Sequence, residues 1–124
     1  MGATPAEMKG EALIAVVGTC KSGKTTLVNG LLKKGYRARQ VAQEHSFSPS
    51  MWRRITKPDV LIYLHSEYET AVSRGLNWLE RDHSEQQRRL VHAREHADIE
   101  IASDELEASK VLDQILEFLE KAEI

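Results

Sequence analysis

The segment GTCKSGKT, residues 18–25, has the spacing G-x-x-x-x-G-K-[ST] of a phosphate-binding loop, the Walker A motif. The apolar run ALIAVV precedes it and predicts a buried strand over residues 12–17. The residues that follow, 26–34, predict a helix with apolar side chains on one face. The motif requires a strand, a glycine-rich loop and a helix in this order. This segment therefore decides the predicted fold.

The residue types of the loop suit an anionic ligand. Gly18 and Gly23 allow backbone angles that other residues avoid, so successive amides can turn toward a phosphate. The helix that follows directs its N-terminal N–H groups and its dipole to the same place. Lys24 supplies a positive charge for the β- and γ-phosphates, and the Thr25 hydroxyl is placed to bind Mg²⁺. The predicted nucleotide-binding residues of the loop are Gly18, Thr19, Cys20, Lys21, Ser22, Gly23, Lys24, Thr25 and Thr26.

Length and composition indicate one globular domain. The chain has 124 residues, and we expect a flexible segment over residues 1–11 and a single domain over residues 12–124. The net charge of −2 indicates no general attraction to nucleic acid. Cys20 is the only cysteine, which excludes an intramolecular disulfide. The sequence has no signal-peptide pattern and no apolar run long enough to span a membrane, so we expect a cytoplasmic protein.

Three further segments have the character of strands. Residues 36–43 predict a second strand with Val41 and Ala42 as its apolar content, and residues 97–102 predict a fourth. The third strand, residues 60–64, is apolar on both faces and should therefore lie inside a sheet that is covered on both sides. Strands that alternate with helices predict an α/β fold, a three-layer sandwich with a mostly parallel sheet of about four strands.

The helices between these strands are marked by capping residues and apolar faces. Ser48-Pro49 predicts the start of a short helix with Met51, Trp52 and Ile55 on one face. Ser66-Glu67-Tyr68-Glu69 matches a capping box, and the helix after it should carry Ala71, Val72, Leu76 and Leu79. Asp82-His83-Ser84 predicts a break before a polar helix over residues 84–95. The last helix has an apolar stripe formed by Val111, Leu112, Ile115, Leu116 and Leu119.

Ligands of parallel α/β sheets bind beyond the carboxyl ends of the strands. Besides the loop itself, the residues expected there are Glu44-His45, His65-Ser66 and Ser103-Asp104. The chain has five histidines, and two of them, His92 and His96, are four residues apart on a predicted helix. Such a pair can bind zinc, but no third ligand is obvious, and a solvated helix face is the favoured interpretation.

Two parts of the sequence resemble the small P-loop nucleoside and nucleotide kinases. The first is PDVLIYL, residues 58–64, with the capped helix that reaches residues 71–74, and the second runs from residue 88 through residues 97–101 to the last helix. The resemblance covers most of the chain from residue 12 to residue 119 and implies the P-loop NTPase fold. It places the second strand beside the loop strand, in the position of the Walker B strand.

The resemblance also implies roles for single residues. Glu44 would be the acid that holds Mg²⁺ through water or polarises the acceptor hydroxyl, so Thr25 and Glu44 are the expected metal residues. Arg81, Arg88, Arg89 and Arg94 would lie in the lid, whose arginines grip the transferred phosphoryl group. Ser103 and Asp104 would lie near the base. The residues expected to be catalytic are Lys24, Glu44, Arg88 and Arg89.

The acceptor is not identified by the sequence. Such kinases carry an extra strand and helices between the loop helix and the Walker B strand, and these elements hold the acceptor; here only a few residues separate the two. The guanine-selecting Asn-Lys-x-Asp pattern is absent, which favours ATP over GTP. Three functions therefore stay open: a small kinase-like phosphotransferase with an unknown acceptor, a degenerate nucleotide-binding module that contacts a protein partner, and a slow ATPase acting on a partner.

Overall fold

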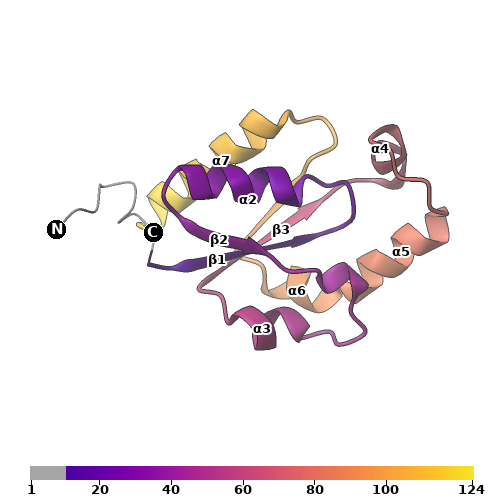
Figure 1. Cartoon of the computed structure of the whole chain (residues 1–124), viewed down its shortest axis with the longest axis horizontal. Helices are drawn as coiled ribbons and strands as arrows, with labels where there is room; N and C mark the ends of the chain where they lie inside the picture. The colour runs from indigo at the N-terminus through magenta and orange to yellow at the C-terminus, as the bar shows by residue number, and fades with distance from the viewer. Residues whose placement is uncertain (1–10) are drawn as a thin grey trace.

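The computed structural model describes residues 11–124, so the segment expected to be flexible, residues 1–11, lies outside the described residues except for Glu11. The elements in chain order are β1 (Leu13–Gly18), α2 (Lys24–Lys33), β2 (Arg37–Gln40), the 3₁₀ turn η1 (Gln43–His45), α3 (Met51–Thr56), β3 (Val60–His65), α4 (Tyr68–Ser73), α5 (Glu80–Arg89), α6 (Val91–His96), β4 (Ile99–Ala102) and α7 (Ala108–Lys121). Strands and helices alternate along the chain, as the sequence predicts (Figure 1).

The four strands form one parallel sheet in the order β2-β1-β3-β4. In β1, Val16 lies opposite Gln40 of β2 and Gly18 lies opposite Leu64 of β3. The predicted parallel sheet is confirmed, as is the interior position of the strand that contains residues 60–64. Because all strands run in one direction, their carboxyl ends and the loops that follow them share one edge of the sheet.

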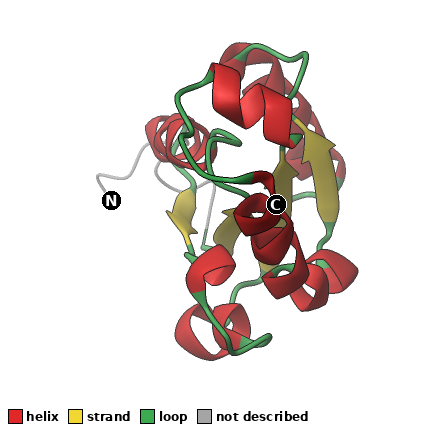
Figure 2. Ribbon diagram, turned by 90° about the vertical axis from the view of Figure 1, so that its right-hand side faces the viewer, coloured by secondary structure: helices red, strands yellow, loops and turns green. Residues whose placement is uncertain are grey.

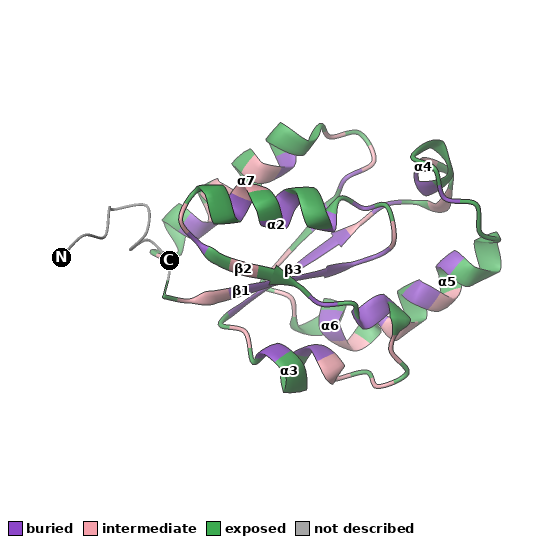
Figure 3. Ribbon diagram, in the orientation of Figure 1, coloured by how far each residue is buried: buried purple, intermediate pink, exposed green. Residues whose placement is uncertain are grey.

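Helices cover both faces of the sheet, α2 and α7 on one and α3 and α6 on the other (Figures 1 and 2). The alternation of side chains along β1 divides the core into two parts. Ile14 and Val16 pack toward α2 and α7, whereas Ala15 and Val17 pack with Trp52 of α3. The two inner strands are buried along almost their whole length, and the exposed residues lie mainly on the outer sides of the helices (Figure 3).

The last helix has the predicted apolar stripe. Val111, Ile115 and Leu119 are buried, and Leu112 and Leu116 pack against the same core. This spacing of three and four residues places one face of α7 against the sheet and α2.

Within residues 11–124, no helix combines the length and the apolar character needed to cross a bilayer.

The second strand is shorter than predicted. It covers Arg37–Gln40, and the chain then bends into η1 instead of remaining extended to residue 43. Gln43 is completely buried: its Oε1 accepts a bond from the Trp52 N–H at 2.8 Å, and its Nε2 donates to the Ser48 carbonyl at 2.7 Å. These bonds favour the bend, which places Glu44 one turn beyond the strand.

The segment between β3 and β4, which contains α4 and α5, differs more from its prediction. Helix α4 ends at Ser73, and Gly75 follows with a φ of 106°, so Leu76 and Leu79 lie outside the helix. A glycine in this conformation commonly ends a helix. The Asp82-His83-Ser84 segment, expected to be a break, lies inside α5, where His83 is buried and contacts the Tyr68 ring.

Two predicted helix starts are also wrong by one to two residues. The N-cap of α4 is Glu67 and not Ser66, and the Glu67 side chain makes no capping hydrogen bond. Helix α3 begins at Met51 after Ser50 and not at Pro49, and Ile55 is 57% exposed instead of lying on the apolar face. The Ser66 N–H is engaged elsewhere: it donates to the Thr19 hydroxyl at 3.2 Å, which connects the end of β3 to the loop after β1.

The two loop glycines are required for different reasons. Gly23 has a φ of 104° and supplies the left-handed turn that the sequence predicts. Gly18 does not have a positive φ. A Cβ at Gly18 would lie 1.8 Å from the Leu64 carbonyl oxygen, so this position needs glycine because β1 and β3 approach too closely for any side chain.

Gly18→Ala should therefore destabilise the fold by about 3 kcal/mol or more, because the obstacle is backbone and cannot rotate away. Gly30→Ala is the matched control. Its added Cβ would meet the end of the flexible Leu112 side chain at 2.9 Å, and alanine is favoured in a helix by about 0.5–1 kcal/mol. Urea unfolding of the two variants measures the difference. Equal losses of stability would contradict the steric role of Gly18.

Candidate functional site

The glycine-rich loop, residues 18–25, leads from the end of β1 into the first turn of α2 at the carboxyl edge of the sheet. Lys21 and Gly23 have left-handed backbone angles, with φ values of 64° and 104°. The Ser22 N–H donates to the Thr19 carbonyl at 3.2 Å and closes a turn. The first N–H groups of α2 therefore face the region in front of this loop, where they favour an anion.

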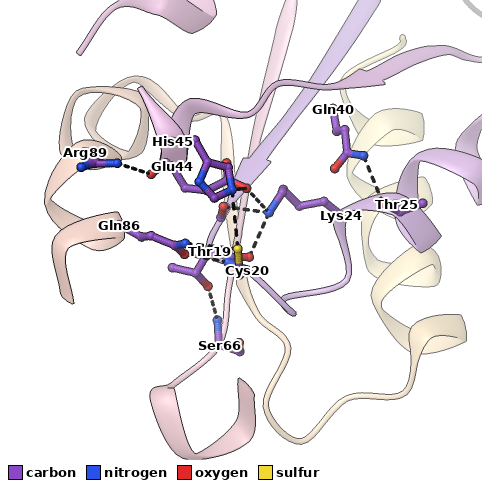
Figure 4. A network of polar contacts seen from close by, with 11 residues as sticks. Thr19, Cys20, Lys24, Thr25, Gln40, Glu44, His45, Ser66, Gln86 and Arg89 are labelled. Atoms are coloured by element: carbon purple, nitrogen blue, oxygen red, sulfur yellow. Dashed lines mark hydrogen bonds and ion pairs between the residues drawn. The ribbon is translucent and has the colours of Figure 1, made fainter. Parts of the chain in front are cut away.

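Lys24 is the centre of a buried polar network (Figure 4). Its amine donates to the carbonyls of Gly18 at 2.9 Å and Thr19 at 3.0 Å, and it forms an ion pair with Glu44 Oε2 at 2.8 Å. Only 8% of the Lys24 side chain and 5% of the Glu44 side chain are exposed. All three protons of the ammonium group therefore have acceptors, and the ion pair connects the loop to η1.

Only one oxygen of the Glu44 carboxylate has a polar partner among the described residues. Oε2 accepts from Lys24, whereas Oε1 is buried and has no hydrogen-bond partner among residues 11–124. A buried oxygen without a donor costs on the order of 1–3 kcal/mol. Such an atom is a candidate ligand for a cation or for a bound donor group.

Thr25, the other residue expected to bind metal, has a different neighbour. Its hydroxyl accepts a bond from Gln40 Nε2 at 3.1 Å, and its side chain is exposed in the first turn of α2. Gln40 ends β2, so this bond connects the loop helix to the neighbouring strand. Gln40 was not predicted as a site residue, because its position opposite Thr25 depends on the register of two strands.

Cys20 is held by a pair of bonds to Gln86 of α5. The Cys20 N–H donates to Gln86 Oε1 at 3.0 Å, and Gln86 Nε2 donates to the Cys20 sulfur at 3.1 Å. The sulfur also lies 3.8 Å from His45 Nε2. Sequence reasoning missed Gln86, because one glutamine in a polar helix has no distinguishing signal in the sequence.

Ser103 and Arg74 attach the loop to the segments that follow β4 and α4. Ser103, which follows β4, is buried, and its hydroxyl donates to the Ser22 carbonyl at 2.8 Å. Arg74, just after α4, donates to the Lys21 carbonyl at 2.7 Å and to the Ser103 carbonyl at 2.6 Å. The predicted proximity of Ser103 to the loop is therefore present, and Arg74 is a further site residue that the sequence did not indicate.

Asp104 follows Ser103 in the chain, but its carboxylate binds the start of α4 and not the loop. Its Oδ1 accepts from the Glu67 N–H at 2.7 Å. Burial tends to raise the pKa of the Asp104 carboxyl, but hydrogen bonds from Thr70 and from the backbone outweigh this effect and leave the pKa below its usual value. The carboxylate is therefore ionised at neutral pH and is engaged in holding the start of α4 near the loop.

The predicted lid arginines are dispersed. Arg89 lies near the site: its Nη1 is 3.5 Å from the Glu44 carbonyl, and its guanidinium lies over the Phe47 ring at 4.2 Å. Arg88 is exposed and pairs with Glu85, whose pKa this hydrogen bond lowers. Arg94 pairs with Glu100 of β4 at 2.9 Å and lies over Tyr63. Arg81, at the start of α5, is exposed.

Two cavities flank the glycine-rich loop. One of 350 Å³ lies between the loop, Arg74 and the segment from Ser103 to Val111. The other, of 420 Å³, lies on the opposite side and is lined by Cys20, Lys24, Glu44, Gln40 and residues 75–78. A third cavity of 300 Å³ shares Trp78 with the second and extends to His45 and Arg89. The loop therefore separates two spaces that a bound molecule could fill.

The Lys24–Glu44 ion pair is open to a direct test. Lys24→Met leaves a buried carboxylate without its cation and should cost about 3–5 kcal/mol, and Glu44→Gln should also destabilise the fold. The double variant buries no charge at either position, so its loss should be smaller than the sum of the single losses by on the order of 1–3 kcal/mol. Urea unfolding of the four proteins gives this coupling, and additive losses would show that the two side chains do not interact.

No protein-family model and no curated protein matches this sequence. The site itself combines a loop at a helix N-terminus, a buried lysine, a carboxylate with one unpartnered oxygen among the described residues, and two flanking cavities.

Proposed function

We propose that this chain is a P-loop protein that binds a nucleoside triphosphate, preferably ATP, with Mg²⁺ at residues 18–25, and that it acts as a small kinase-like phosphotransferase. The observation that carries the proposal is the buried Lys24 ammonium, held by two loop carbonyls and Glu44 beside the N-terminus of α2. A cation and a helix N-terminus at one loop suit the phosphates of a nucleotide.

In this proposal the two cavities beside the loop hold different molecules, the base of the nucleotide in one and the phosphate acceptor in the other. The 350 Å³ cavity has an apolar side formed by Leu27, Leu64, Leu106 and Val111, which suits the flat face of a base. The 420 Å³ cavity contains Lys24 and Glu44 and is the candidate place for a phosphate acceptor. In this assignment the transferred phosphoryl group lies at the loop, between the nucleotide and the acceptor.

The oxygen atoms at the loop fit Mg²⁺, which prefers oxygen ligands and retains several waters. The Thr25 hydroxyl is exposed, and Glu44 Oε1 has no other donor among the described residues. Mg²⁺ bound with the nucleotide would neutralise charge on the phosphates. Glu44 would hold a metal-bound water or accept the acceptor's proton, and Arg89 is the lid arginine nearest to Glu44 in this proposal.

One observation favours the second candidate, a nucleotide-binding module without phosphotransfer. The charge of Glu44 is already paired with Lys24, and Arg88 and Arg94 are paired with Glu85 and Glu100. A protein whose charged groups keep these partners after nucleotide binding would bind the nucleotide, and signal its presence to a protein partner, without transferring a phosphoryl group. Phosphotransfer requires instead that Lys24 turn from Glu44 to the phosphates.

Lys24→Ala should weaken ATP–Mg²⁺ binding by about tenfold or more, because charge-assisted contacts are worth about 1.5–3 kcal/mol. Calorimetry on folded protein measures the affinity, and Lys33→Ala, at the exposed end of the same helix, is the matched control. Thr25→Val leaves the buried ion pair between Lys24 and Glu44 intact. This variant should reduce only the part of the ATP affinity that depends on Mg²⁺. Equal ATP affinity in wild type and Lys24→Ala would exclude this site.

Glu44→Gln separates the two candidate functions. If Glu44 acts in phosphotransfer, this variant should keep most ATP affinity but lose about tenfold or more of the turnover found in a screen of phosphate acceptors. Thermal unfolding verifies the fold of the variant. ATP binding without turnover in the wild-type protein, together with an unchanged Mg²⁺ response in Glu44→Gln, would favour the binding module.

A further inference from the structure

Three different metal-ligating side chains meet between the glycine-rich loop and η1. They are the Cys20 thiol, the Glu44 carboxylate and the His45 imidazole, and their ligand atoms all lie within 4.8 Å of one another. The nucleotide-binding proposal uses the Glu44 carboxylate but has no role for the thiol or the imidazole. We propose that Cys20, Glu44 and His45 form a site for a zinc-like transition-metal ion, which goes beyond the proposed function and does not depend on it.

The distances suit a tetrahedral ion. Zn²⁺ lies about 2.3 Å from sulfur and about 2.0 Å from nitrogen or oxygen, which places a bound sulfur and nitrogen about 3.5 Å apart and a nitrogen and oxygen about 3.3 Å apart in a tetrahedral site. The Cys20 sulfur lies 3.8 Å from His45 Nε2, and His45 Nε2 lies 3.9 Å from Glu44 Oε2. The Cys20 sulfur and the Glu44 carboxylate lie within 4.8 Å of each other, so shifts of up to about 1 Å, shared between the exposed imidazole and the thiol, would complete the geometry.

The unpartnered carboxylate oxygen is a second and independent sign of a ligand. Glu44 is 4% exposed, and its Oε1 accepts no hydrogen bond within residues 11–124. Oε2, the oxygen 3.9 Å from His45 Nε2, is shared with Lys24, so a metal that also binds the neighbouring Oε1 of the same carboxylate would leave the Lys24 bond in place. A bound cation also removes the cost of leaving Oε1 without a donor.

Neighbouring groups support the ligands as outer partners do in metal sites. Gln86 Nε2 donates to the Cys20 sulfur at 3.1 Å, which fixes the direction of this side chain. The Lys24 ammonium binds the Gly18 and Thr19 carbonyls and so holds the backbone just before Cys20 in place. The His45 ring packs edge-on against Trp78 with centroids 6.0 Å apart, which limits its rotation.

The ligand types select the metal. Thiolate and imidazole suit Zn²⁺ and similar ions, whereas Mg²⁺ and Ca²⁺ require oxygen ligands. Three protein ligands leave a fourth position for water or another ligand. Cys20 and Glu44 line the 420 Å³ cavity and His45 lines the 300 Å³ cavity beside it, so an ion could enter from solvent and its open position would face these spaces.

The test is a Zn²⁺ titration of the untagged full chain under reducing conditions without nucleotide, monitored by competition with a chromophoric chelator. We expect one Zn²⁺ per chain, with affinity reduced by at least tenfold in Cys20→Ser and in His45→Gln. His96→Gln is the matched control, because His96 is exposed and stacks on His92 in the other candidate histidine pair. Millimolar Mg²⁺ should leave the Zn²⁺ affinity unchanged.

Cobalt substitution reports on the thiolate directly. Co²⁺ in wild-type protein should show a sulfur-to-metal charge-transfer band that is absent in Cys20→Ser. If that variant folds poorly, Zn²⁺ should protect Cys20 of the wild type, but not of His45→Gln, from alkylation. Unchanged Zn²⁺ affinity in both ligand variants, loss of binding in His96→Gln alone, or a Co²⁺ complex without the band would overturn the proposal. Failure of ATP binding would not affect any of these measurements.

Discussion

The buried ion pair between Lys24 and Glu44 is the interaction on which the site depends. Lys24 begins the loop helix and Glu44 lies in a turn beyond the neighbouring strand, so their contact connects two segments at the carboxyl edge of the sheet. Because burying a single charge is costly, each side chain requires the other. The two loop carbonyls that Lys24 also contacts are thereby fixed relative to η1.

The close approach of β1 and β3 at Gly18 also fixes the position of this loop. β1 and β3 approach so closely at Gly18 that the Leu64 carbonyl occupies the place of a side chain. In the residues that follow Gly18, the Thr19 hydroxyl accepts a hydrogen bond from the Ser66 N–H. The Ser22 carbonyl accepts one from the Ser103 hydroxyl. A side-chain hydroxyl and a backbone carbonyl of the loop are therefore attached to the segments just after β3 and β4, which gives the loop a fixed shape before any ligand binds. Preformed sites of this kind reduce the entropy lost on binding.

The chemistry around the loop is divided between its two sides. One side has an apolar cavity bordered by Arg74 and Ser103, and the other has the carboxylate, the thiol and the imidazole. The proposed nucleotide site and the proposed metal site share Glu44 and therefore compete for, or cooperate through, one buried carboxylate. By thermodynamic linkage, any effect of the metal on nucleotide affinity must be matched by an equal effect of the nucleotide on metal affinity.

The sequence alone determined the class of fold, the parallel sheet of four strands with residues 60–64 inside it, the stripe of α7 and the position of the glycine-rich loop between β1 and α2. These features follow from local periodicity and glycine placement, which act over a few residues. The partners of the site were decided by tertiary structure. Glu44 meets Lys24 because Gln43 is buried and ends β2 early, and Cys20 meets His45 and Gln86 because α5 packs against η1. Such contacts join residues 20–66 positions apart, and no local pattern encodes them, since they depend on strand register and on where each helix ends.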